Sequence, residues 1–149
     1  MSSIYNKTDN DLVISRINKL SPESKAEWGK MNAAQMLSHC QAPMDVAFGI
    51  ITVKPNFIMQ LLGRMMKKKI INAPEFSKNS PTAPEFIRNT PCDFEQSKSE
   101  LINKISVLAI DGAKLIKVNK HPFFGEMSTD DWNKLMWKHL DHHLRQFGV

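Results

Sequence analysis

The chain has 149 residues, which fits a single domain spanning residues 1–149 that buries about 70% of the surface its unfolded form exposes. Its 42% hydrophobic and 23% charged residues are typical of a globular protein and exclude a largely disordered chain. The net charge is +5, and the densest basic cluster covers residues 64–69. This cluster has no interleaved aromatic residues and no nucleic-acid-binding motif, so we interpret it as a solvated helix face and expect no nucleic-acid partner.

Two amphipathic helices are predicted in the first third of the chain. Thr8, followed by Asp11 three residues later, forms a capping-box pattern for the first helix, which a Ser-Pro pair ends. Apolar residues at helical spacing predict the second helix over residues 32–48. His39 lies on the apolar stripe of this second helix.

The middle of the chain predicts an extra helix and a long connection. Apolar residues recur at helical spacing over residues 56–71, directly after a proline. We interpret this methionine-rich stripe as a core or dimer contact rather than a cofactor site. Residues 72–91 are polar and hold four prolines, which predicts a long irregular crossover between the two halves of a helical bundle. These prolines are Pro74, Pro81, Pro84 and Pro91.

Two further helices are predicted in the last third. One covers residues 93–111 and is followed by Gly112, which suits a helix C-terminus. Ser128 and Asp131 form a capping box for the last helix. No segment shows the alternation of a strand. The sequence therefore predicts an all-α protein, a four-helix bundle with a long crossover connection and an extra helical segment between helices two and three.

Three histidines lie on the apolar stripes of two of these helices. His139 and His143 are four residues apart and share one face of the last helix, and His39 faces inward from the second. A single inward histidine is more often a core residue bonded to a backbone carbonyl than a ligand. Burying three imidazoles costs free energy unless something pairs with them, and a transition metal supplies that pairing. The joint pattern favours a metal site.

Several motifs resemble those of the DinB-like (DinB/YfiT-type) superfamily, in a branch whose proteins are mostly uncharacterised. They are the W-G-K-M sequence at 28–31, Q-M-L-S-H at 35–39, H-P-F-F-G at 121–125 and H-x-x-H-H-x-x-Q at 139–146. The resemblance covers both ends of the chain, whereas residues 50–92 match no motif. It implies a four-helix bundle in which His39, His139 and His143 hold a divalent metal ion. It also implies a small thiol or another small molecule as substrate, because the superfamily includes thiol-dependent S-transferases, isomerases and some metal-dependent hydrolases.

A three-histidine site leaves metal positions open, as in catalytic rather than structural zinc sites, and zinc, nickel, iron and manganese all accept nitrogen ligands. Gln146 and Asp45 are candidates to orient the rings. His142 is interpreted as an exposed residue or a support for the ligands rather than a substitute ligand. His121 has two interpretations: an acid or base beside the metal, or, preferred here, part of a surface turn whose phenylalanines close the core. No catalytic residue is assigned.

Three functions follow as hypotheses. The first is a metal-dependent thiol S-transferase or hydrolase, and the second is a non-catalytic metal-binding stress or dimerisation module that forms a homodimer. The third, which has the least support, is a protein that binds anionic surfaces through residues 64–69. The N-terminal residues are polar, and no apolar run is long enough to span a bilayer. Cys40 and Cys92 form no C-x-x-C pair, which is typical of a reducing compartment. We therefore expect no membrane partner and a cytoplasmic location.

Overall fold

The computed structural model describes residues 2–80, 82–88 and 90–149 and confirms the all-α prediction. Its helices are α1 (Lys7–Asn18), α2 (Ala33–Ala47), α3 (Phe57–Asn72), α4 (Phe94–Asp111) and α5 (Thr129–Gln146), with 3-10 turns at Pro84–Phe86 and Gly112–Leu115. A short antiparallel hairpin, β1 (Lys120–His121) and β2 (Gly125–Glu126), precedes α5. The sequence predicted no strand, because two residues are too few to show alternation. Pro81 of the predicted crossover lies outside the described residues.

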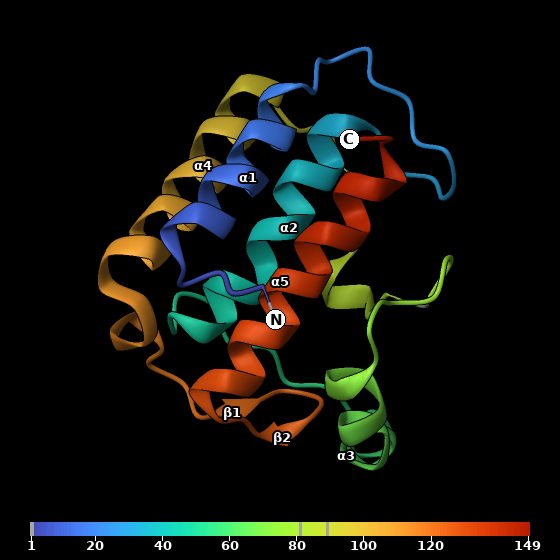
Figure 1. Ribbon diagram of the computed structural model, residues 1–149. Helices are drawn as coiled ribbons and strands as arrows, with labels where there is room; N and C mark the ends of the chain where they lie inside the picture. The colour runs from blue at the N-terminus through green and yellow to red at the C-terminus, as the bar shows by residue number, and fades with distance from the viewer. Residues whose placement is uncertain (1, 81, 89) are drawn as a thin grey trace.

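Four helices pack around one core (Figure 1). α2 contacts α4 on one side and α5 on the other, and α1 also contacts both α4 and α5, so the four helices close a ring. The core inside this ring consists mainly of aliphatic and methionine side chains, with Trp132 of α5 fully buried among them. None of the helices in the described part of the chain is both long and apolar enough to cross a membrane.

The predicted starts of α2 and α5 are confirmed, whereas that of α1 is wrong. Asn32 and Ser128 each form a capping box at the helix they begin. At α1 the cap is Asn6, whose side chain accepts a hydrogen bond from the amide of Asp9, and Thr8 already lies inside the helix. Asn and Thr are both good caps, so local sequence does not choose between them. The Asp9 carboxylate also accepts from the Ser3 amide, which ties the preceding chain to the first turn.

Helix α3 lies apart from the four-helix ring, at the lower right of Figure 1, and contacts α5 and the hairpin. Its C-terminal end is held by Lys138 of α5, whose ammonium group donates to the carbonyls of Ile70, Ile71 and Ala73. Ile71 is its one buried residue. The core alternative of the prediction is therefore wrong, whereas the dimer contact stays a prediction. The apolar side chains that α3 exposes are Phe57, Ile58, Met59, Leu61, Leu62, Met65 and Met66.

Candidate metal centre

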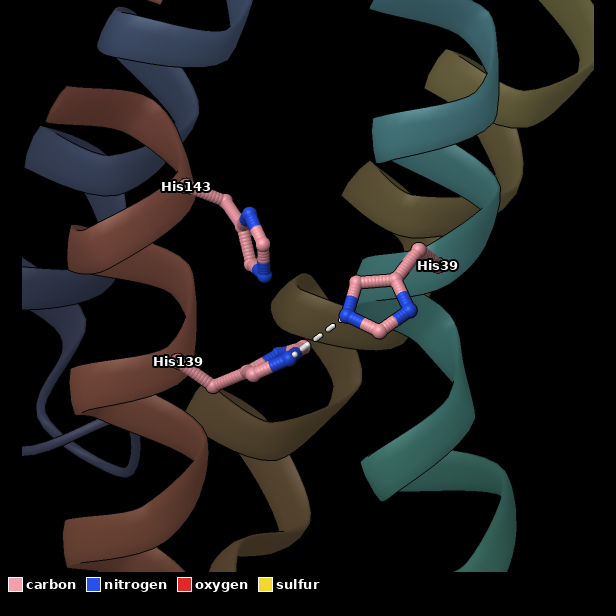
Figure 2. Close-up of side chains that lie close together, drawn as sticks. All are labelled: His39, His139 and His143. Carbon is pink, nitrogen blue, oxygen red and sulfur yellow. Dashed lines mark hydrogen bonds between the residues drawn. The ribbon is translucent and has the colours of Figure 1, made fainter. Parts of the chain in front are cut away.

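Three imidazole rings meet between α2 and α5. His39 comes from α2, and His139 and His143 lie one turn apart on α5. One ring nitrogen from each residue lies within 4.8 Å of those of the other two, and the Nε2 atoms of His39 and His139 are 3.0 Å apart. Figure 2 shows the rings turned toward one another from the two helices. The structure thus brings together the three predicted ligands in a group that could hold a metal ion.

Two of the rings are oriented by hydrogen bonds on their far side. His39 donates from Nδ1 to the carbonyl oxygen of Phe86 at 2.9 Å. His143 donates from Nδ1 to Gln146 Oε1 at 2.7 Å, and Gln146 is held in turn because its amide nitrogen donates to the carbonyl of Trp28. Gln146 therefore orients a ring, as predicted. Because both acceptors require a proton on Nδ1, the Nε2 atoms of His39 and His143 carry lone pairs, as metal ligation requires.

The third ring leaves unpaired polar atoms in the cluster. His139 Nδ1 is buried and has no hydrogen-bond partner among the described residues. Its Nε2 faces the Nε2 of His39. If His139 carries its proton on Nε2, it donates a hydrogen bond to His39, but the lone pair on Nε2 of His143 still has no donor. A divalent ion placed among the three nitrogens would accept all three lone pairs. The donor set therefore fits zinc, nickel, iron or manganese.

Burial keeps these rings in the neutral form that binds metals. Desolvation lowers the pKa of His39, although the Phe86 carbonyl opposes the shift, and it lowers the pKa of His143 to about 3. For His139, desolvation and the neighbouring histidines lower the pKa well below its usual value. His39 and His143 are buried, whereas His139 is partly exposed. The Nδ1 atom of His139 is nevertheless enclosed, so the exposed part of this residue lies elsewhere on it.

The comparisons with known proteins assign a family. A family model matches residues 5–148 and thus covers all three histidines. The chain belongs to the family described as "Protein of unknown function (DUF1569)". No curated protein and no solved structure matches it. The family assignment therefore covers nearly the whole chain of this DUF1569 protein but brings no activity with it.

Two other polar residues considered from the sequence lie outside the cluster of this DUF1569 protein. Asp45 pairs with Lys104 of α4, with an oxygen–nitrogen distance of 2.8 Å, so the prediction that it orients a histidine is wrong. Six residues beyond His39 corresponds to about 240° around the helix, which turns the carboxylate to a different neighbour. His142 is half-buried beside the ring of Trp28, at 5.8 Å between centroids, and does not belong to the cluster.

Backbone groups and a ring beside the site had no signal in the sequence. The carbonyl of Phe86, which accepts from His39, comes from the 3-10 turn within the predicted crossover. The carbonyl of Trp28 holds Gln146. The ring of Phe76 lies 6.4 Å from that of His139, centroid to centroid, and forms part of the surroundings of the cluster. A backbone acceptor can belong to any residue type, so only the folded chain identifies it.

His121 lies in the hairpin and not among the metal-site histidines. Its Nδ1 accepts hydrogen bonds from the amides of Phe123 and Phe124, at 3.1 and 3.3 Å. Its ring stacks on that of Phe124 at 4.4 Å between centroids and lies 5.2 Å from that of Trp132. These contacts match the turn interpretation, with Phe123 buried, but the histidine ring is itself buried.

Proposed function

We propose that this protein binds one divalent metal ion through His39, His139 and His143 and uses it to act on a small molecule. The observation that carries the proposal is the fixed orientation of the rings: hydrogen bonds to Phe86 and Gln146 hold His39 and His143 with Nε2 directed at a common point. Hydrogen bonds of this kind are characteristic supports of metal-binding histidines. The motif resemblance to the DinB-like superfamily supports the same proposal.

The proposed reaction is a thiol S-transfer or a hydrolysis. An ion held by three neutral imidazoles keeps its full charge and open positions, and so supplies a Lewis acid that acidifies a water or thiol ligand. His139 is the least buried of the three histidines, and in this proposal a small thiol or another substrate approaches the ion on its side. The rings of Phe76 and Trp28 flank His142 beside this cluster and provide apolar surface for the body of a substrate.

A non-catalytic metal-binding module is the second candidate. It is favoured by the composition of the cluster, which includes no carboxylate among the described residues and therefore places no general base next to the ion. A homodimer stays a prediction, and the exposed apolar face of α3 is the surface it would use. A cytoplasmic location likewise stays a prediction, consistent with the two free cysteines.

Metal binding is tested with untagged protein dialysed against zinc and analysed for bound metal. We expect about one ion per chain in the wild type, and loss of tight binding in His39→Ala, His139→Ala and His143→Ala, because two nitrogens hold the ion far less well than three. His142→Ala is the matched control, since it removes a neighbouring imidazole that is not in the cluster, and should retain the ion. Equal losses in His142→Ala and His143→Ala would refute the ligand assignment.

Cobalt substitution separates the two candidate functions. An open three-nitrogen site admits thiols or azide, so either ligand should change the visible spectrum of the cobalt protein. A spectrum that is indifferent to both would show a closed site and favour the non-catalytic module. An assay of thiol conjugation to an electrophile, with His143→Ala as the inactive control, then tests turnover.

A further inference from the structure

A cavity lies beside the hairpin, away from the metal centre. Its volume is about 400 Å³, and its walls come from the segment after α2, from α3 and from the hairpin. None of the three clustered histidines lines it. The volume falls within the range of small-molecule sites.

The charged side chains that line this cavity are positive. Lys54, Arg64 and Lys120 line it, and no aspartate or glutamate in the described part of the chain does. Among the described residues, none of these three cations forms an ion pair. Glu126 lies opposite Lys120 in the hairpin register but does not line the cavity. An anion in the cavity would therefore meet cations that no carboxylate neutralises.

A largely buried histidine also borders the cavity. His121 lines it and is only 7% exposed. Because its Nδ1 accepts from two backbone amides, the ring proton lies on Nε2, and no described residue accepts from that atom. Exposed lysine and arginine side chains need no partner, since water solvates them. Nε2 is not among the enclosed side-chain atoms that lack a partner, so solvent or a ligand reaches this N–H group. A largely buried ring that presents a donor without a protein acceptor at the wall distinguishes this cavity from an ordinary basic surface.

We propose that the cavity binds a small organic anion. Its carboxylate or phosphate group accepts from Arg64 and from His121 Nε2, and Lys54 and Lys120 add to the attraction. Its body packs against the apolar part of the wall. The apolar lining residues are Val46, Ile51, Val53, Pro55, Val118 and Pro122. This site does not depend on the metal centre.

Benzoate, phenyl phosphate and benzamide test this proposal on protein freed of metal with a chelator, so that no anion binds through an ion. Benzamide matches benzoate in shape but lacks its charge. We expect both anions to bind, benzamide to bind at least about tenfold more weakly, and the Nε2–H resonance of His121 to shift in proton–nitrogen spectra when benzoate is added. Binding by only one of the two anions would still support the site and would identify the head group.

Two variants distinguish a specific binding site from non-specific attraction of anions to a basic surface. Arg64→Gln should weaken benzoate binding about tenfold, the loss expected for one charge-assisted hydrogen bond. Lys68→Gln removes the same charge from an exposed position on α3 that does not line the cavity, and should leave binding nearly unchanged. Equal effects of the two variants, equal binding of benzoate and benzamide, or an unshifted His121 resonance would overturn the proposal. The metal-binding experiments have no bearing on this result.

Discussion

Acidification should destabilise the fold through His121. Desolvation lowers the pKa of this buried ring to about 3, against 6.5 for an exposed histidine. The folded pKa is the lower one, so the unfolded chain binds more protons at any pH below about 6.5. The stabilising effect of the neutral ring is therefore present above pH 6.5 and is lost as the pH falls toward 3.

The size of the effect follows from the two pKa values. Between pH 7 and pH 5, protonation of the unfolded chain at this one residue should lower the free energy of unfolding by about 2 kcal/mol, and between pH 7 and pH 3 by about 4 kcal/mol. The ring is only 7% exposed, so water screens little of this cost.

His121→Asn isolates the contribution of this ring. The asparagine oxygen can take the place of Nδ1 as acceptor for the amides of Phe123 and Phe124, but the side chain does not titrate. Urea unfolding of the metal-free wild type and variant at pH 7 and pH 5, in buffers without carboxylate or phosphate, gives the change in the free energy of unfolding between these pH values for each protein. The other four histidines titrate in both, so their effects cancel in the difference.

The variant is expected to be less stable than the wild type at pH 7, because it loses ring packing, but to lose about 2 kcal/mol less on acidification. An equal loss in both proteins would show that His121 is not held neutral by the fold. A pKa of His121 near 6.5, measured by its ring resonances, would refute the reasoning directly.

Two further predictions concern the metal centre and the packing of α3. Gln146→Leu should weaken zinc binding about 10–100-fold in a chelator competition, because Nδ1 of His143 loses its acceptor. Gln146→Glu keeps an oxygen at this position and should lose less affinity. Equal affinity in the wild type and the leucine variant would contradict the role of this contact. Alanine favours helices more than glycine does, yet Gly63→Ala should destabilise the protein by about 1–3 kcal/mol in urea unfolding, because the added Cβ overlaps the backbone carbonyl of Phe123. A gain in stability would show that α3 packs loosely on the hairpin.

The metal-site histidines show which features of the site can be predicted from local sequence. His139 and His143 share a face because helical geometry alone sets their relation, and the capping residue Ser128 places the start of their helix. The inward position of His39 follows from the same periodicity in α2. Helix type, these caps and the three candidate ligands are therefore readable from residues that lie close together in the chain.

Only the tertiary structure decided what lies against each helix. The apolar stripe of α3 was predicted to be a core or dimer contact. It does not belong to the core, because the four other helices close the core without it, and its exposure leaves the dimer contact a prediction. The carbonyl of Phe86 and the ion pair of Asp45 with Lys104 likewise depend on segments far apart in sequence. Periodicity shows which residues share a face, but burial and hydrogen-bond partners depend on which other segment packs against that face, and this is set by the packing of the whole chain.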